Sequence, residues 1–341
     1  MSFLQVIWFL LVGVLLTGFA ILDGFDLGVG VWYLRAKGDK DRRTLLNAIG
    51  PVWDGNEVWL LTGGGAIFAA FPPVYASVFS GFYLAMMLVV FCLITRAVSL
   101  EFRSKEESPR WRQVFDAAFS VSSTVAGLLF GVALGNILRG IPLSEAGDYT
   151  GTFFGLLNPY ALLIGVLGLV MFAFQGANFI TLKAADDLRV RAGRWVAVTG
   201  IVYLVLFVAA SGATLAAMPH LTENFSAVPV LWLIPAAAVA AIVLAILYAR
   251  KDQPKRAFFF SSLSIAGMMG ITGASLFPRL VPALNAPELS LTAANASSSE
   301  LTLEVMLVMA LVGMPLVLGY TIWVYRAFAG KVDPESPSSH Y

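Results

Sequence analysis

Long apolar segments alternate with short charged segments along most of the chain. Apolar runs of about 20 residues, the length that crosses a bilayer as an α-helix, recur from one end of the sequence to the other. The pair Pro72-Pro73 separates the second run from the third and predicts a tight hairpin there. The pattern predicts an all-α polytopic membrane protein with nine transmembrane helices, at 5–33, 53–71, 74–98, 115–138, 157–182, 195–217, 228–249, 257–280 and 303–328.

Three short matches in the same order indicate that the first four spans are repeated in the next four. The matched pairs are Gly64–Pro72 with Ser211–Pro219, Ser122–Leu129 with Ser262–Met269, and Leu22–Asp26 with Phe174–Asn178. Four helices per unit is an even number, so the units share one orientation and form two parallel four-helix repeats. We expect a first bundle with the intramembrane acids at 1–140, a second at 150–281, and an external loop, a peripheral ninth helix and a cytoplasmic tail at 282–341.

Composition indicates the class of protein, and the distribution of charge predicts its orientation in the membrane. Because 58% of the residues are hydrophobic and 13% are charged, a soluble protein is excluded. The first span lacks a small-residue cleavage site and is expected to be a retained helix. Of the 22 lysines and arginines, all but Arg139 and Arg279 lie on one side, so we expect the N-terminus outside and the C-terminus in the cytoplasm. The net charge of +1 says nothing about partners, and we expect no nucleic acid among them.

Four carboxylates lie in or beside the first two spans. Asp23 and Asp26 fall inside the apolar segment LLTGFAILDGFDLGVGVWYL. Asp54 and Glu57 open the second span at positions i and i+3, which share one helix face. A carboxylate at bilayer depth costs roughly 2.5–3.5 kcal/mol on insertion scales, so four in consecutive spans need a reason. Since the predicted orientation puts Asp54 and Glu57 at the cytoplasmic side, we interpret the four acids as a path for proton uptake.

Other interpretations of these acids stay open. Acids near a helix start are favoured by the macrodipole and by free backbone N–H groups, which would explain the acids of the second span. Pairing with Arg35 or Arg96 would explain those of the first span and would make the chain a purely structural assembly partner. A stand-alone secondary transporter also combines parallel repeats with intramembrane acids. The second unit, however, has the neutral Gln175 and Asn178 where the first has Asp23 and Asp26.

We expect no catalytic, cofactor-binding or metal-binding residue in this chain. His220 is predicted in a loop and His340 in the tail, so neither is placed to hold a haem within a span. The single cysteine, Cys92, lies mid-span and excludes a disulfide within the chain. Three acids near span ends are expected to be surface or interface groups rather than proton relays: Glu101, Asp116 and Glu304.

Several long motifs carry a family resemblance. LVGVLLTGFAILDGFDLGVG, RRTLLNAIGPVWDGNEVWLLTGGGAIFAAFPPVYASVFSGFY and FRSKEESPRWR closely resemble subunit II of the cytochrome bd family of quinol oxidases. The later segments LLNPYALLIGV, FSSLSIA and SSSELTL are similar to the same subunit, so the resemblance covers nearly the whole chain.

The resemblance implies a role in a bacterial respiratory complex of the cytoplasmic membrane that oxidises quinol and reduces oxygen to water without a separate proton pump. It implies a heterodimer with subunit I, which holds two b-type haems and one d-type haem. Small single-helix accessory subunits, lipid and quinol are the other implied partners, and some members carry a structural quinone in subunit II. In family members, the acids matched by Asp54 and Asp26 are implicated in a proton route towards the haems.

Overall fold

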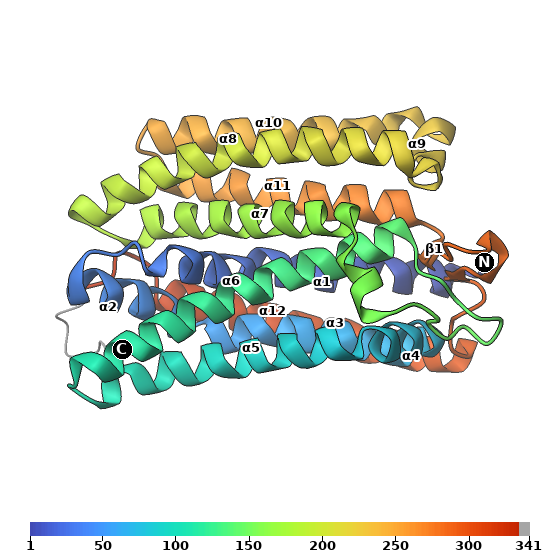
Figure 1. Cartoon of the computed structure of the whole chain (residues 1–341), viewed down its shortest axis with the longest axis horizontal. Helices are drawn as coiled ribbons and strands as arrows, with labels where there is room; N and C mark the ends of the chain where they lie inside the picture. Colours follow the sequence, from blue (N-terminus) through green and yellow to red (C-terminus); the bar gives the residue numbers. More distant parts are fainter. Residues whose placement is uncertain (334–341) are drawn as a thin grey trace.

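The computed structural model describes residues 1–333, and within them the fold is almost entirely helical. Long helices run between two ends of the molecule (Figure 1). The N-terminus lies at the same end as a two-stranded antiparallel sheet of β1 (Arg279–Val281) and β2 (Leu291–Thr292). The opposite end carries the short helix α2 (Gly38–Ile49). His340 and the last part of the predicted tail lie outside the described residues.

Eight helices within residues 1–333 are long and apolar enough to cross a membrane, which confirms an all-α polytopic membrane protein. α5 is prolonged by the 3-10 helix η1 (Arg103–Lys105), and α10 is preceded by η4 (Pro229–Trp232). The eight helices are α1 (Phe3–Tyr33), α5 (Tyr83–Phe102), α6 (Pro109–Arg139), α7 (Pro159–Lys183), α8 (Asp186–Ala217), α10 (Leu233–Arg250), α11 (Pro254–Leu276) and α12 (Glu300–Ala327).

The predicted second span is a helix, α3 (Trp53–Ala70), but it does not belong to these eight. Its first five residues include Asp54, Asn56 and Glu57, whose polarity lowers the mean hydropathy of an 18-residue helix. At 1.5 Å per residue such a helix is about 27 Å long, close to the thickness of the hydrocarbon core. The count of nine spans therefore stays a prediction that depends on α3.

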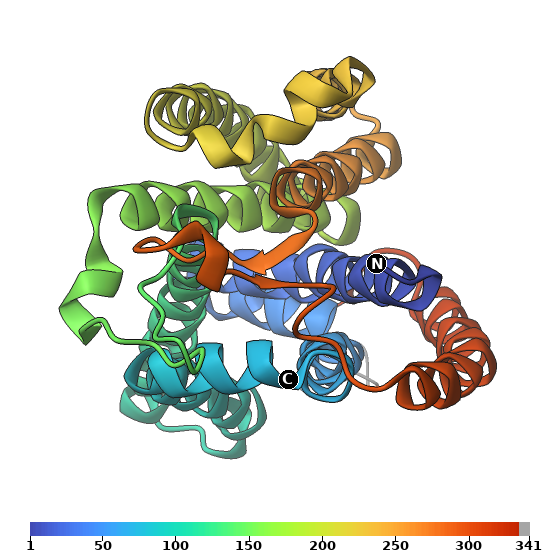
Figure 2. The same ribbon diagram turned by 90° about the vertical axis from the view of Figure 1, so that its right-hand side faces the viewer.

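The predicted hairpin at Pro72-Pro73 is wrong. Both prolines lie in the first turn of a further helix, α4 (Pro72–Gly81). Backbone N–H groups in a first turn have no partner within the helix, so proline, which lacks the N–H, is tolerated there. α4 lies across one end of the molecule, roughly perpendicular to its neighbours (Figure 2). The predicted third span at 74–98 is thus divided between α4 and α5, which begins at Tyr83.

Short elements form most of the connections at the end that carries β1. They are η2 (Phe153–Leu157), η3 (Pro219–Leu221), α9 (Glu223–Ala227) and η5 (Pro287–Leu289). Two long helices begin before their predicted spans, α6 at residue 109 instead of 115 and α8 at residue 186 instead of 195. Their first turns are charged, so the helix continues beyond the apolar segment that the prediction followed.

α1 is the central helix, and it packs against α7 at very short range. A Cβ atom on Gly28 would lie 1.9 Å from the backbone oxygen of Phe172 and 2.8 Å from Cα of Gly176, so only glycine fits there. Beside this contact the rings of Phe25 and Phe179 stack with centroids 4.0 Å apart. Asp23 and Asp26 lie on the same stretch of α1 and are fully buried, and their hydrogen-bond partners Arg96 and Asn56 come from α5 and α3.

Candidate functional site

Asp23 on α1 and Arg96 on α5 form a buried, bidentate ion pair. Arg96 Nη2 donates to Asp23 Oδ1 over 2.6 Å, and Nη1 donates to Oδ2 over 3.1 Å. The side chains are 0% and 1% exposed, respectively. Of the two arginines considered from the sequence, Arg96 is thus the one that pairs, while the guanidinium of Arg35 lies over the ring of Trp32. Removing one partner of such a pair costs about 3–5 kcal/mol, because the other charge stays buried.

Asp26 lies beside this pair but is balanced less completely. Its Oδ2 accepts a 2.8 Å hydrogen bond from Asn56 Nδ2 and lies 3.9 Å from Arg96 Nη2. Within residues 1–333 its Oδ1 has no hydrogen-bond partner, although the side chain is 0% exposed. Two carboxylates therefore share one guanidinium, and Asp23 takes both of its hydrogen bonds.

The second pair of acids leads from this cluster to the surface. Asp54 is exposed and Glu57 is half-buried, both near the start of α3. Glu57 lies close enough to Asp54 on one side and to Asp23 and Arg96 on the other to interact with their charges. The N-cap residue of α3 is the apolar Val52, so Asp54 lies in the first turn, where the helix dipole favours it, and not at the cap. The structure thus orders the acids by burial, from the exposed Asp54 to the fully buried pair on α1.

Gln175 and Asn178, which the predicted repeat matches to Asp23 and Asp26, lie in a neutral polar environment. Gln175 Oε1 accepts a hydrogen bond from Ser261, and its Nε2 donates to Ser262 Oγ over 2.9 Å. Asn178 Nδ2 donates to the backbone oxygen of Phe174 over 2.9 Å. Both amides are fully buried, and neither is titratable.

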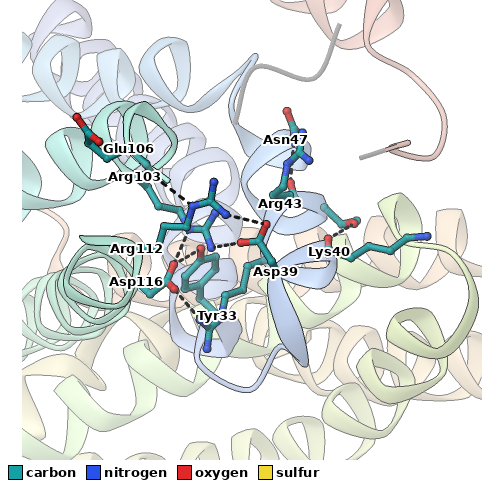
Figure 3. Close-up of polar contacts among 11 residues, drawn as sticks. Tyr33, Asp39, Lys40, Arg43, Asn47, Arg103, Glu106, Arg112 and Asp116 are labelled. Atoms are coloured by element: carbon teal, nitrogen blue, oxygen red, sulfur yellow. Dashed lines mark hydrogen bonds and ion pairs between the residues drawn. The ribbon is translucent and has the colours of Figure 1, made fainter. Parts of the chain in front are cut away.

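A second charged cluster lies where α2, η1 and the start of α6 meet, and Figure 3 shows its centre. Asp116 was expected at the surface or at an interface, and this prediction is wrong, because the residue is 1% exposed. Its Oδ1 accepts hydrogen bonds from Tyr33 and from Arg103 Nε, and its Oδ2 accepts one from Arg42, all over 2.6 Å. These donors converge from separate segments, so the sequence alone does not reveal that they cover the carboxylate. Glu101 and Glu304 are exposed.

Asp39 on α2 extends this cluster towards the surface. Its Oδ1 accepts a 2.6 Å hydrogen bond from Arg103, and Arg112 lies 3.5 Å from its Oδ2. Partial burial alone would raise the pKa of Asp39, but the hydrogen bond and charge of Arg103, with the charges of Arg112 and Arg43, hold the pKa below its usual value. The cluster therefore ties the loop after α1 to the loop after α5.

A large apolar cavity of about 1020 Å³ lies between the helices. Its walls come from most of the long helices and include Leu60, Phe79, Met86, Met171, Phe207 and Met268. His220 does not line this cavity, and its Nε2 is hydrogen-bonded to the backbone oxygen of Leu138 at 2.9 Å. Within residues 1–333 no group of three or more His, Cys, Asp and Glu side chains could hold a metal ion. The residues around the cavity thus do not fit a haem held by histidine.

Comparison with known proteins decides the family. Residues 4–328 match the family described as "Cytochrome bd terminal oxidase subunit II". The chain belongs to this family. It is similar to "Cytochrome bd-I ubiquinol oxidase subunit 2" of Escherichia coli K12, with 41% identity over 97% of this chain and 96% of the relative. It is 35% identical to "Cytochrome bd ubiquinol oxidase subunit 2" of Bacillus subtilis, over the full length of both.

The fold of this subunit II also resembles a solved structure. A chain of the bd oxidase from Geobacillus thermodenitrificans superposes with a TM-score of 0.79, covering 96% of this chain and 99% of that one, at 18% identity. The resemblance inferred from the sequence motifs is thereby confirmed at the level of the family, and the helical fold at the level of structure.

Sequence reasoning missed three members of the buried clusters of this subunit II. Asn56 lies within the WDGNEVW motif, where its position between two acids was the available signal. Tyr325 on α12 donates a 2.8 Å hydrogen bond to Asn56 Oδ1, although the two residues are 269 positions apart in the sequence. No local sequence pattern predicts this contact. The hydrogen bond from Tyr33 to Asp116 also joins distant segments and was missed for the same reason.

Proposed function

We propose that this chain is the haem-free subunit of a cytochrome bd-type quinol oxidase and that it carries protons from the cytoplasm towards its partner subunit. The route runs from Asp54 and Glu57 at the start of α3 to Asp26 and Asp23 on α1. The observation that carries the proposal is the arrangement of these four acids in order of burial, ending at a cluster with more carboxylates than cations.

Asp26 is the member of this cluster that exchanges the proton. Asp23 accepts both hydrogen bonds that Arg96 donates to the cluster. Asp26 has one amide donor, a more distant guanidinium and, within the described residues, an oxygen that no donor occupies. A buried carboxylate that lacks full compensation takes up a proton readily, and a partly charged environment lets it release that proton again.

The complex supplies the redox chemistry. In this proposal subunit I holds two b-type haems and one d-type haem and oxidises quinol, with small single-helix subunits beside the heterodimer. Charge moves because the protons consumed in oxygen reduction come from the cytoplasm, while those of quinol are released outside. The N-terminus then lies outside and the C-terminus in the cytoplasm, which agrees with the basic residues around α2 and with Arg139 and Arg279 at the opposite end.

We extend the proposal to nine spans built as two four-helix repeats with α12 outside them. Phe71 ends α3 with backbone angles of −134° and 63°, and Met218 ends α8 with −129° and 65°. Both residues precede a proline that starts the next helical segment. These are the positions matched by the sequence repeat, which supports the parallel duplication.

The apolar cavity is the place where a structural quinone fits in this subunit. Its volume of about 1020 Å³ and its aliphatic and aromatic walls suit an isoprenoid chain. Tyr160 and Thr214 line the same cavity and are hydrogen-bonded to each other over 2.9 Å, and the Thr214 hydroxyl donates to the backbone oxygen of Ala210. Organic extraction of the purified complex, before and after a bulky Ala210→Trp substitution in the cavity wall, tests for this quinone.

One observation favours a second candidate function, that of a purely structural partner. The ion pair between Asp23 and Arg96 is complete by itself and joins α1 to α5. If this pair were the whole purpose of the cluster, the acids would stabilise the bundle and carry no protons. The unpaired oxygen of Asp26 and the acids leading to it are not explained by that role.

Turnover of the assembled complex separates the two functions. Asp54→Asn and Asp26→Asn preserve size and hydrogen bonding but remove the titratable proton. We expect both complexes to assemble, judged by the haem spectrum, and to reduce oxygen more slowly per haem, with the milder effect for Asp26→Asn. Wild-type turnover in both variants would overturn the proton path and leave the structural role.

A further inference from the structure

The last long helix, α12, is attached to the rest of the chain mainly through its ends. Only 6% of the residues in its apolar stretch are buried. Near its C-terminal end, however, Lys183 on α7 donates a hydrogen bond to the backbone oxygen of Phe328, and the N–H of Val332 donates to the backbone oxygen of Lys183 over 2.9 Å. In the same region the ring of Tyr325 meets Phe25 on α1 edge to face.

The hydroxyl of Tyr325 reaches the acid cluster through one side chain. It donates a 2.8 Å hydrogen bond to Asn56 Oδ1, and Asn56 Nδ2 donates over 2.8 Å to Asp26 Oδ2. A phenol at neutral pH donates its proton most readily to a carbonyl oxygen, so it fixes which end of the amide faces which neighbour. With Oδ1 held by Tyr325, the amide can only donate to Asp26.

The direction of this second bond matters for proton exchange. An amide N–H that donates to a carboxylate stabilises its ionised form, whereas an amide oxygen in the same place would accept a hydrogen bond from the protonated acid and stabilise its neutral form. Without the hydroxyl, apart from the bond to Asp26 itself, only a long contact of 3.5 Å between Asn56 Nδ2 and the backbone oxygen of Leu22 opposes rotation of the amide by half a turn, which would exchange one environment for the other.

We propose that Tyr325 is a positioning residue of the proton path, which fixes the amide of Asn56 so that Asp26 releases its proton easily. The proposal rests on the proposed function of the acids. It also gives the exposed helix α12 a part in that function. Among the described hydrogen bonds, the one from the Tyr325 hydroxyl links α12 to the acid cluster.

Several charged groups face Asp26 from the surrounding helices and remain unchanged when the hydroxyl is removed. Asp23 lies on the same helix, Arg96 faces it from α5, and Glu57 interacts with it from α3. Since a substitution at Tyr325 leaves these charges in place, a change in the pH dependence of turnover reports the amide and not a lost charge.

The experiment compares Tyr325→Phe with Tyr320→Phe in the complete oxidase. Both substitutions remove one hydroxyl from α12, but Tyr320 is on its exposed face, 64% accessible. We expect assembly and haem content to be unchanged in both. In Tyr325→Phe the pH profile of turnover should move to higher pH, on the order of half a unit, and in Tyr320→Phe it should not move. An unmoved profile in Tyr325→Phe overturns the inference.

A second variant distinguishes positioning from simple support. In the Asp26→Asn background, position 26 has no titratable proton that the amide of Asn56 could influence. Tyr325→Phe should therefore add no further loss of turnover. An additional, independent loss would assign Tyr325 a structural role and overturn the inference. If Asp54→Asn and Asp26→Asn both turn over like the wild type, the proton path fails. If Asp26→Asn alone does so, or if only Tyr325→Phe is without effect, the positioning role falls.

Discussion

At the scale of single residues, two buried arginine–carboxylate clusters differ in their balance of charge. Arg96 faces two carboxylates, and the cluster is short of positive charge. Asp116 instead accepts from two arginines and a tyrosine, so it is fully compensated. A fully compensated carboxylate holds segments together, whereas an incompletely compensated one exchanges protons. In the proposed function, this difference gives Asp116 a structural task and makes Asp26 the group that exchanges protons.

The ion pair of Arg96 yields the first prediction. Arg96→Gln removes the partner of Asp23 and leaves a buried carboxylate uncompensated, at a cost of about 3–5 kcal/mol. We expect little assembled complex, measured as haem absorbance per membrane protein. The double variant Asp23→Asn/Arg96→Gln replaces the ion pair with two neutral amides and should recover assembly. Equal assembly in the single and double variants would contradict the account of this pair.

Asp39 gives a prediction about pH. Its pKa is lower in the folded chain than the ordinary value, so it stabilises the fold above about pH 4, and this contribution is lost as the pH falls through the folded pKa. Because its side chain is 45% exposed, the contribution is at most about 1 kcal/mol. Asp39→Asn should lower the melting temperature slightly at pH 7. The difference in melting temperature between Asp39→Asn and wild type should shrink below pH 4, as measured by thermal unfolding in detergent. A difference that stays constant with pH would contradict the stabilising role of the Asp39 carboxylate.

At the scale of elements, periodicity and apolar length predict helices well and their connections poorly. The two acids in α1 stood out because they interrupt an apolar segment, and the helix around them was predicted within two residues at either end. The break at Pro72-Pro73 was recognised, but a proline pair both ends one helix and begins another, so α4 was missed. The partners of the acids, Asn56 and Tyr325, depend on how distant helices pack, which no local pattern records.

The contact between α1 and α7 provides a prediction at this scale. Gly28→Ala would place a methyl group 1.9 Å from the backbone oxygen of Phe172 and force the helices apart. Overpacking of this kind costs about 1–3 kcal/mol or more, so we expect a strong loss of assembled complex. Gly13→Ala is the matched control on the same helix, because nothing lies within 4 Å of its added methyl group. Assembly that is equally good in both variants would refute the close packing.

At the scale of the whole molecule, the two ends differ in charge and in structure. One end carries α2 and most of the basic residues, and the other carries β1, η5 and the N-terminus (Figure 1). Family membership and the helical fold follow from motifs and composition, because these signals extend over nearly the full chain. The arrangement of helices around α1 does not, because it is set by a few close contacts such as that of Gly28 with Gly176.

Sidedness is a prediction for the whole chain. With Cys92→Ser as background, Lys251→Cys lies between α10 and α11, and Glu288→Cys lies in η5 at the opposite end. Both positions are exposed. In intact spheroplasts a membrane-impermeant maleimide should label Glu288→Cys and leave Lys251→Cys unlabelled until the membrane is opened. The reverse labelling would show that the orientation is opposite to the predicted one and that the acid path opens outside and not to the cytoplasm.

Proton uptake during a single turnover tests the central claim most directly. The reduced complex, reconstituted in vesicles with its acid path facing a pH dye, is mixed with oxygen while haem oxidation and proton uptake are followed together. In Asp54→Asn and Asp26→Asn we expect oxygen to bind as in wild type and proton uptake to slow at least tenfold, while the control Asn178→Gln behaves like wild type. Proton uptake at the wild-type rate in both acid variants would contradict the account.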